Sequence, residues 1–457
     1  MNKDISAYIF RAYDIRGLYG KDIDPELFYC IGLSAGTYVK NYMHGTTLAV
    51  GNDIRQTSHV LVHSFISGVT ATGINVSYTK TTSFGQTLFS GWKNKNDLIA
   101  YVTASHLPPE WNGIKFYYGD GVGLPEDELN HIRDYTLNHG WKTADFSRVG
   151  RVKIVDTRES YKSFFKKSFQ FQKKIRVAVD CGGASMTLSA PDIFKSLSLD
   201  FIPVYCDPDP LFSQRPSDPK PEHLETLKKK VTEEQCDFGV AFDGDGDRSV
   251  IIDNQGTILS ADETAIIIGK YGLESKKGII IANVECSKTL AEQLTPLGFS
   301  IKKIQVGHTF LTLHAKKEQA LLGVESSGHL ILPEYFLFDD ALVIPLKIAE
   351  ILDNTTKSLA ELRREIPSYP TQKIEIPCDD DVKFKVINRL QKSFTEQYTD
   401  TNTLDGVRID FPDGWVLIRA SNTSPLIRLT TEGKTNEIVE SYAKEFTKKT
   451  QDVINSC

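Results

Sequence analysis

Three stretches of the chain repeat one pattern of hydrophobic and polar residues. Each begins with a run of apolar, mostly β-branched residues, continues through a polar loop and a segment with helical spacing, and ends in another β run. The first strands start near Leu48, Val177 and Ile279, which are about a hundred residues or more apart. This order predicts strand–helix–strand units in parallel or mixed sheets, and the distances are those between domains rather than solenoid repeats. The sequence therefore predicts three successive α/β domains of related design.

The last ninety residues follow a different pattern. Ser358 and Glu361 fit a capping box and predict a short helix, which Pro367 and Pro370 end. After the prolines come the β run TQKIEIPC, the amphipathic DVKFKVINRLQKSF, the paired β runs GVRIDF and GWVLIRA, and the amphipathic NEIVESYAKEFTKKTQDV. These segments predict a small α+β domain with a hairpin. The domains expected for the whole chain are 1–152, 153–255, 256–367 and 368–457.

Composition narrows the class of protein. With 457 residues the chain is too long for one ordinary core. Its 40% hydrophobic and 25% charged residues are typical of a soluble globular protein, and the net charge of -6 argues against general nucleic-acid binding. No apolar run reaches the roughly 20 residues that span a bilayer, and no secretory signal is evident at the start. The seven cysteines form no CxxC pair. They indicate reduced thiols in a cytoplasmic protein, without a zinc site.

The segment AFDGDGDR, residues 241–248, is the strongest chemical motif. Asp243, Asp245 and Asp247 alternate with glycines, so the backbone can bend tightly while the carboxylates converge. Oxygen ligands alone select a hard cation such as Mg²⁺ or Ca²⁺. An EF-hand loop is excluded because Arg248 and Asn254 stand where that loop needs glycine and glutamate, and because β runs flank the motif. A solvated acidic turn is the remaining alternative to a metal site.

Ser105 poses the question of whether it is a nucleophile. It lies in VTASHLPPEWNGIKF, residues 102–116, where turn-forming residues follow it. These are Pro108, Pro109, Asn112 and Gly113. On this local evidence a hydroxyl in a turn is favoured over a nucleophile.

Three further motifs are weaker when taken singly. In GVESSGH, Glu325, Ser327 and His329 are spaced by two and could bind a polyhydroxylated sugar, or the segment could be an ordinary strand-to-turn transition. In RASNTSP, Arg419 and the following hydroxyl and amide groups could cradle a dianion, although a Ser/Thr-rich turn ended by Pro425 fits equally well. FRAYDIRG, residues 10–17, says little alone.

The combination and order of FRAYDIRG, TASHLPPEWNGIK, DGDGDR, GVESSGH and RASNTS closely resembles the α-D-phosphohexomutases. FRAYDIRG and the possible sugar-binding motif GVESSGH look most like the phosphomannomutase/phosphoglucomutase branch. The resemblance covers the whole chain. It implies four domains around a central cleft, which agrees with the three α/β units and one α+β unit predicted from the hydrophobic pattern.

The resemblance also implies roles for individual residues. Ser105 matches the serine that carries a phosphoryl group, and a phosphoserine oxygen would complete a site for one Mg²⁺. The metal ligands would then be Ser105, Asp243, Asp245 and Asp247. Arg248 is suited to contact the same phosphoryl group. The residues expected to move protons are Arg16, Lys115 and His308, with Tyr13 supporting Arg16. The residues expected to bind substrate are Tyr13, Glu325, Ser327, His329, Arg419, Ser421, Asn422 and Thr423.

The implied reaction interconverts hexose 6-phosphate and hexose 1-phosphate. The phosphoserine would donate its phosphoryl group to a free hydroxyl, and the resulting hexose 1,6-bisphosphate, also the activator, would turn around and rephosphorylate Ser105. The expected partners are small hexose phosphates, with neither nucleic acid nor membrane, and the chain is expected to be a monomer or homodimer. The resemblance implies that one set of residues holds the non-reacting phosphate in both orientations of the sugar. The fourth domain is therefore expected to be mobile, so that it can close and reopen.

Two positions depart from the family pattern, and two alternatives stay open. Leu107 follows Ser105 and His106 where the family has asparagine, and Glu285 stands where a basic residue is common. These departures put the loop hydrogen bonding and the sugar preference in question. The alternatives are a phosphoglucosamine mutase, against which the FRAYDIRG start argues, and a non-catalytic sugar-phosphate-binding protein on the same fold.

Overall fold

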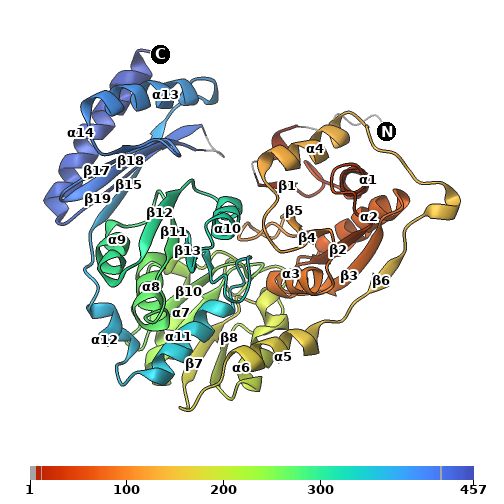
Figure 1. Cartoon of the computed structure of the whole chain (residues 1–457), viewed down its shortest axis with the longest axis horizontal. Helices are drawn as coiled ribbons and strands as arrows, with labels where there is room; N and C mark the ends of the chain where they lie inside the picture. The colour runs from red at the N-terminus through yellow and green to blue at the C-terminus, as the bar shows by residue number, and fades with distance from the viewer. Residues whose placement is uncertain (1–6, 12, 422–424) are drawn as a thin grey trace.

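The structure is a computed structural model that describes residues 7–11, 13–421 and 425–457 of the chain. These residues form four sheets, which follow one another in the sequence as the colours of Figure 1 show. We call each sheet and its helices the first, second, third and fourth unit. No helix in these described ranges is both long enough and apolar enough to cross a membrane.

The first unit has six strands in the order β1-β5-β4-β2-β3-β6. β5 is antiparallel to both of its neighbours, whereas β4, β2, β3 and β6 are parallel. The strands are β1 (Asp14–Leu18), β2 (Thr47–Asn52), β3 (Asn75–Thr81), β4 (Leu98–Val102), β5 (Trp111–Tyr118) and β6 (Val152–Ile154). The helices are α1 (Pro25–Asn41), α2 (Ser58–Ala71), α3 (Phe84–Lys93) and α4 (Glu126–Leu137). β6 carries this sheet past residue 152, where the sequence placed a domain boundary.

The second unit has the strand order β10-β9-β7-β8, and the third has β12-β11-β13-β14. The elements of the second unit are α5 (Arg158–Ser168), β7 (Arg176–Asp180), α6 (Ala190–Ser196), β8 (Asp200–Val204), α7 (Glu225–Glu233), β9 (Phe238–Phe242) and β10 (Ser249–Asp253). Those of the third are α8 (Ala261–Ile267), β11 (Ile279–Asn283), α9 (Lys288–Leu294), β12 (Ser300–Ile304), α10 (His308–Lys317), β13 (Leu322–Val324), β14 (Leu330–Ile331), α11 (Val343–Asn354) and α12 (Leu359–Arg364).

The first three units share one topology. In each, a central strand pairs in parallel with the two strands that follow it in the chain, and a fourth strand joins antiparallel to the third. The equivalent sets are β2-β3-β4-β5, β7-β8-β9-β10 and β11-β12-β13-β14. The prediction of three related α/β domains is therefore confirmed.

The fourth unit is an antiparallel sheet in the order β15-β19-β18-β17-β16, on which two long helices pack. It follows α12, which Ser358 and Glu361 cap reciprocally as the sequence predicts. The α+β prediction is confirmed. Its elements are β15 (Thr371–Pro377), α13 (Asp380–Gln397), β16 (Thr401–Asn402), β17 (Val407–Phe411), β18 (Gly414–Ala420), β19 (Leu426–Gly433) and α14 (Asn436–Asn455).

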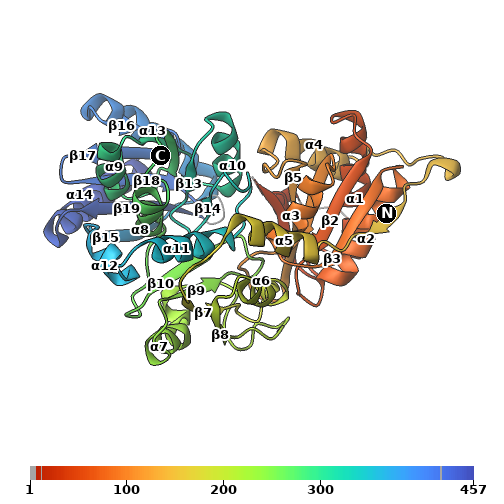
Figure 2. The same cartoon turned by 60° about the horizontal axis from the view of Figure 1, so that its bottom comes forward.

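The first three units share one hydrophobic core, whereas the fourth unit has its own. One hydrophobic cluster runs through the first three units and includes Phe84, Phe165, Phe242 and Val324. In the turned view of Figure 2, α5 lies beside α3, where this shared core crosses between units. The fourth unit has a separate core, and among the described residues one small hydrophobic cluster around Trp415 connects it to the third. Buried hydrophobic contacts therefore hold the first three units to one another more strongly than they hold the fourth unit to the third.

A buried carboxyl group lies where the first three units meet. Asp340 is 2% exposed, and its side chain accepts hydrogen bonds from the Tyr161 hydroxyl at 2.5 Å and the Leu342 N–H at 3.1 Å. Gly85 allows this approach, since a Cβ there would lie 2.4 Å from Asp340 Oδ2. Burial raises the pKa of Asp340 to about 7.

We expect Asp340 to make stability fall as pH rises from about 4 to about 7. The native carboxyl group still holds a proton in this window, whereas the unfolded one has lost it, so each pH unit costs about 1.4 kcal/mol of unfolding free energy. Thermal unfolding against pH would measure this slope. Asp340→Asn should flatten it, whereas Asp134→Asn on the surface of α4 should not. Equal slopes for wild type and Asp340→Asn would contradict the assignment.

Candidate active site

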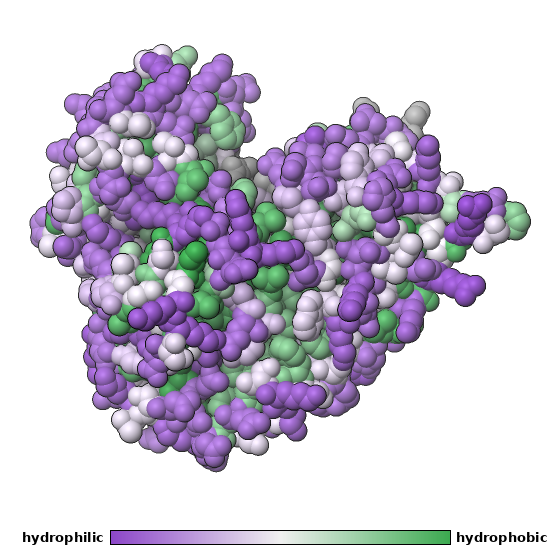
Figure 3. Space-filling view, viewed as in Figure 1, coloured by the Kyte–Doolittle hydropathy of each residue, from purple (hydrophilic) through white to green (hydrophobic). Residues whose placement is uncertain are grey.

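Three of the predicted motifs occupy the same position in their units. Ser105 lies in the connection from β4 to β5, the aspartate cluster lies between β9 and β10, and Glu325 lies between β13 and β14. Each is the connection from the third strand to the antiparallel fourth strand. The repeated topology thus supplies one functional loop from each α/β unit. The surface is notched between the first unit and the fourth, where the space-filling view shows a hollow (Figure 3).

Ser105 is buried and points at the aspartate cluster. It is 4% exposed, and its hydroxyl donates to Asp243 Oδ2 at 3.3 Å. Its φ of +52° lies in the left-handed region, which is uncommon for a residue other than glycine. The Ser105 N–H donates to Thr103 Oγ1 at 2.9 Å, which helps to hold this conformation. The turn predicted from the local sequence exists, but it aims the hydroxyl at a group in another unit.

Arg55, which no sequence motif predicted, holds the Ser105 loop through the carbonyl groups of that loop. The guanidinium, on a side chain fully buried beside Asp53, donates to four loop carbonyls. These are Ser105 at 2.8 Å, Leu107 at 2.7 Å, Pro108 at 2.5 Å and Trp111 at 3.2 Å. A signal was present, because Asp53 and Arg55 directly follow a predicted parallel strand, where functional polar residues gather.

Leu107 takes part in this network through its backbone. Its N–H donates to Ala104 O at 3.1 Å, and its carbonyl also accepts from Ser217 Oγ of the second unit at 3.0 Å. Ser217 reaches the His106 carbonyl as well, at 2.7 Å. Backbone groups, which any side chain at position 107 leaves in place, therefore hold this part of the loop.

The three aspartates converge as the alternating glycines predict. Asp243 and Asp245 are fully buried and Asp247 is 1% exposed, and one carboxylate oxygen of each lies within 4.8 Å of the others. Gly246 has a φ of +85°, and a Cβ at Gly244 would lie 2.3 Å from the Ser105 carbonyl. Both glycines are thus required, one by the bend and one by the contact between units.

Positive groups compensate part of this negative charge. Lys115 of β5 donates to Asp245 at 2.9 Å and to Asp247 at 2.6 Å, and Arg248 Nε lies 3.2 Å from Asp243. Burial opposes ionisation at Asp245, yet Lys115 holds its pKa below the usual range. Burial and the two neighbouring carboxylates raise the pKa of Asp243. The charge balance of the cluster is therefore incomplete without a further cation.

The donor set fits a hard metal ion. Asp245 Oδ1 and Asp247 Oδ1 are buried and have no hydrogen-bond partner among the described residues, which is costly for carboxylate oxygens. A cation bound by oxygen atoms would satisfy them. A second acidic group contains Asp247, Asp339 and His329.

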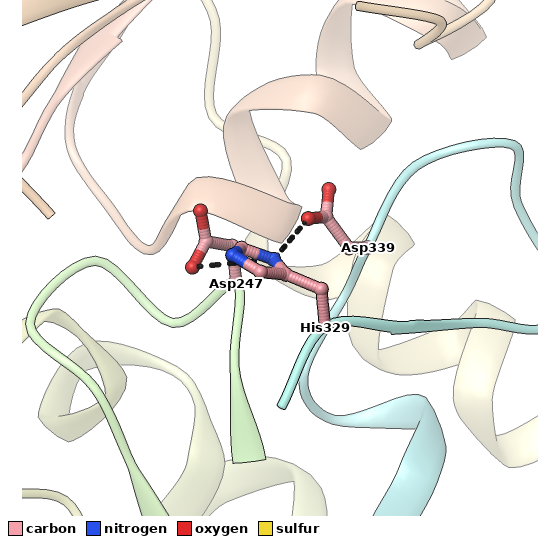
Figure 4. A group of neighbouring side chains, drawn as sticks. All are labelled: Asp247, His329 and Asp339. Carbon is pink, nitrogen blue, oxygen red and sulfur yellow. Dashed lines mark hydrogen bonds and ion pairs between the residues drawn. The ribbon is translucent and has the colours of Figure 1, made fainter. Parts of the chain in front are cut away.

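His329 is held away from a metal-ligand role by its neighbours. Figure 4 shows its ring between two carboxylates, with Nδ1 2.6 Å from Asp339 Oδ2 and 3.9 Å from Asp247 Oδ1. Burial alone would lower its pKa, but Asp247 and Asp339 raise it to about 9. A protonated imidazole has no free lone pair for a metal, so His329 acts here as a positive group beside the aspartates.

The predicted proton-transfer residues gather around the same cluster. Arg16 lies beside Asp14, with Nε 2.9 Å from Asp14 Oδ1, so Asp14 supports Arg16. Tyr13, for which the resemblance implies the same role, donates to the Val306 carbonyl at 3.0 Å. His308 begins α10, and its ring stacks on His329 with 5.6 Å between centroids. Burial lowers the pKa of His308 to about 4, and its Nδ1 has no partner among the described residues.

The loop between β13 and β14 presents a carboxylate and a hydroxyl. Ser327 Oγ donates to Glu325 Oε1 at 2.6 Å, and the Gly307 N–H donates to Glu325 Oε2 at 2.7 Å. Ser327 is exposed, whereas Glu325 is 6% exposed. Arg248 Nη1 reaches the Ser327 carbonyl at 3.4 Å, which joins this loop to the aspartate cluster.

Arg419 of β18 is paired with carboxylates from two units. Its Nη1 lies 3.0 Å from Glu285 Oε1 and its Nη2 lies 3.4 Å from Asp405 Oδ2. Glu285 also accepts from Ser326 Oγ at 3.0 Å. The departure at position 285 thus links the loop between β13 and β14 to the arginine of the fourth unit. Ser421 is buried, while Asn422 and Thr423 lie outside the described residues.

Four sheets in this order, with a buried serine hydroxyl aimed at an aspartate cluster, define a sugar-phosphate mutase of the α-D-phosphohexomutase class. Four phosphoglucomutase/phosphomannomutase family models match the chain, namely alpha/beta/alpha domain I at residues 7–142, domain II at 159–256, domain III at 260–369 and the C-terminal domain at 374–449. The chain belongs to the phosphoglucomutase/phosphomannomutase family, and it is a phosphohexomutase.

Individual relatives span the full length of the chain. A phosphomannomutase/phosphoglucomutase of Pseudomonas aeruginosa is 33% identical over 99% of this chain and 97% of its own. A probable phosphoglucosamine mutase of Methanopyrus kandleri is 30% identical over 98% of both chains. The crystal structure of a phosphoglucomutase/phosphomannomutase family protein from Burkholderia thailandensis matches with a TM-score of 0.90 and 25% identity, over 98% of each chain.

Proposed function

We propose that this phosphohexomutase interconverts the 6-phosphate and 1-phosphate of mannose or glucose through a phosphoryl group carried on Ser105. The observation that carries the proposal is the buried Ser105 hydroxyl 3.3 Å from Asp243, at the edge of three converging carboxylates. A serine hydroxyl is a weak nucleophile at neutral pH, and the histidine beside it, His106 with Nδ1 at 3.5 Å, forms no hydrogen bond or ion pair with a carboxylate among the described residues. A serine that is already phosphorylated needs no such pair to begin the reaction.

One Mg²⁺ is the proposed cofactor. Asp243, Asp245 and Asp247 would hold it, with an oxygen on Ser105 completing the set. When bound, the ion supplies charge stabilisation for phosphoryl transfer and orients the phosphoryl oxygens. The protein contributes the buried pocket and its own cations, because Lys115 and Arg248 are fixed beside the aspartates before substrate arrives.

The proton of the attacking sugar hydroxyl needs an acceptor. His308 fits this role, since its lowered pKa keeps the imidazole neutral at physiological pH and its Nδ1 is free of partners among the described residues. Lys115 and Arg16 are positive at that pH and their pKa values are raised, so they are suited to stabilise negative charge that develops on the phosphoryl oxygens. Tyr13 and His329 would help to bind substrate.

The sugar and its second phosphate would be bound by the third and fourth units. The Glu325 carboxylate is suited to accept hydrogen bonds from sugar hydroxyls, and the Ser327 hydroxyl is suited to donate hydrogen bonds to them. Arg419, with Ser421, Asn422 and Thr423, would grip the phosphate that does not react. The separate core of the fourth unit supports the proposal that it opens and closes, which would let hexose 1,6-bisphosphate turn around between the two half-reactions.

A coupled assay with mannose, glucose and glucosamine 1-phosphates, with glucose 1,6-bisphosphate as activator, tests the proposal. We expect turnover of mannose or glucose phosphate above that of glucosamine phosphate. Preference for glucosamine phosphate would favour the phosphoglucosamine mutase alternative. Absence of turnover with all three would favour a non-catalytic sugar-phosphate-binding protein. We further propose a monomeric or homodimeric enzyme of the cytoplasm without a nucleic-acid partner, which the net charge of -6 supports.

Arg419→Ala should raise KM for the sugar phosphate about 10- to 100-fold, with a smaller effect on kcat. Charge-assisted hydrogen bonds to a phosphate contribute about 1.5–3 kcal/mol, and the substrate keeps the same grip in both orientations. Steady-state kinetics would measure the split between KM and kcat. Arg428→Ala on neighbouring β19 is the matched control, because that side chain is 44% exposed. An unchanged KM in Arg419→Ala would remove this residue from the phosphate site.

A further inference from the structure

Two cysteines of the second unit lie in direct contact. Cys181 follows β7, and Cys206 lies just beyond β8, the parallel neighbour of β7. Their Sγ atoms are 2.9 Å apart. This is closer than the roughly 3.5–4.0 Å between nonbonded carbon atoms in a packed core, so the two sulfur atoms are in direct contact. The Cys181 N–H donates to the Val204 carbonyl at 3.1 Å, so the ladder between the strands continues to the position of the pair. The two thiols are therefore held together by the sheet and not by a flexible loop.

The two thiols differ in exposure and in acidity. Cys181 is 0% exposed, whereas Cys206 is partly accessible. Burial raises the pKa of Cys181 well above its usual value, while the hydrogen bond from Cys181 lowers the pKa of Cys206. An accessible thiol of lowered pKa beside a buried thiol is the arrangement of an attacking and a resolving cysteine.

We propose that Cys181 and Cys206 form a reversible redox pair, which hydrogen peroxide converts to a disulfide. The Cys206 thiolate attacks one oxygen of the peroxide, the O–O bond breaks, and hydroxide leaves as a sulfenic acid forms on Cys206. The Cys181 sulfur then attacks the Cys206 sulfur, the S–O bond breaks, and hydroxide leaves with the Cys181 proton as water. The two thiols supply the two electrons that reduce the peroxide to water. The sulfurs must approach only from 2.9 Å to the roughly 2.05 Å of a disulfide.

The Cys181 side of the pair is connected to the aspartate cluster. Asp180, the residue before Cys181, pairs with Arg215 Nε at 3.0 Å. The same guanidinium donates to the Phe242 carbonyl at 2.7 Å, and Phe242 directly precedes Asp243. The Ser185 N–H donates to the Gly244 carbonyl at 3.2 Å. A shift at Cys181 is therefore transmitted to the backbone that carries the proposed metal ligands.

The Cys206 side of the pair leads to the Ser105 loop. The segment after Cys206 contains Ser217, whose hydroxyl donates to the carbonyls of His106 and Leu107. A disulfide would join the start of the segment that follows β7 to the start of the segment that follows β8, and it would draw these two segments together. Since a displacement of about 1 Å can cost up to about 100-fold in rate, we infer that oxidation lowers kcat on the order of tenfold.

Peptide mapping and kinetics on the full-length enzyme test both parts of the proposal. The background is Cys457→Ser, because that exposed thiol would otherwise cross-link two chains. The protein is treated with hydrogen peroxide, alkylated, and digested for mass spectrometry, while kcat is measured before treatment, after it, and after dithiothreitol. Cys181→Ser and Cys206→Ser are the test variants, so that the more exposed position remains informative if the buried one impairs folding. Cys236→Ala removes a different buried thiol of the same unit and is the matched control.

We expect a Cys181–Cys206 peptide, a reversible loss of kcat, and neither effect in the two serine variants. The Cys236→Ala control should behave like the background protein. Oxidation that yields no Cys181–Cys206 peptide would overturn the redox pair. A disulfide that leaves kcat unchanged would overturn the connection to the active site. The peptide is detected without any assay of turnover, so its absence is distinguishable from a failure of the proposed function.

Discussion

Ser105→Ala should abolish mutase turnover, with kcat reduced about 10⁴-fold or more, because no other described hydroxyl donates to the aspartate cluster. Alanine keeps a Cβ, so it meets the same unfavourable left-handed backbone as serine and leaves folding nearly unchanged. The expected result is therefore a folded protein that still binds sugar phosphate and does not convert it. Kinetics and calorimetric binding of glucose 1-phosphate would measure the two properties separately.

Two companion variants sharpen this experiment. Ser105→Gly also lacks the hydroxyl but relieves the strain of the positive φ, so it should be inactive and at least as stable as wild type. Ser67→Ala removes an exposed hydroxyl on α2 and should keep full turnover. Substantial activity in either Ser105 variant would show that the phosphoryl group is carried elsewhere, and the proposed mechanism would fail.

Removal of divalent cations should have the second largest effect. We expect a chelator to stop turnover and added Mg²⁺ to restore it, because buried carboxylate oxygens on Asp245 and Asp247 lack any other partner among the described residues. Asp245→Asn should lower kcat about 100-fold or more, which corresponds to several kcal/mol of lost charge stabilisation. Asp127→Asn, an exposed position on α4, should leave kcat unchanged.

A stability measurement gives a readout that does not depend on turnover. A cation that binds the native state alone raises the unfolding temperature with its concentration. Wild type should show this rise with Mg²⁺, and Asp245→Asn should lose most of it. If wild-type unfolding does not respond to Mg²⁺ and chelation leaves turnover intact, the aspartate cluster is not a metal site.

The sequence by itself determined the order of the units and the chemistry of the strongest motif. Three β–α–β patterns predicted three related α/β domains because apolar runs with this spacing can be buried only in sheets covered by helices. The capping box at Ser358 and the hairpin segments of the last unit were also local properties, and they are confirmed. The Asp243–Asp247 segment was recognisable because alternating glycines let carboxylates converge within five residues.

Tertiary structure alone decided which groups face one another. The contacts of Ser105 with Asp243, of Lys115 with Asp245, and of Glu285 with Arg419 join residues more than a hundred positions apart, and nothing local specifies them. The position of Arg55 after a predicted strand marked it as a candidate, but its role was missed because its partners in the Ser105 loop are backbone carbonyls, which leave no mark on the sequence. In the first three units the repeated sheet topology brings the loops together, and burial in a shared core then fixes their distances. Residue types set the chemistry available to this enzyme, and packing between units set where that chemistry acts.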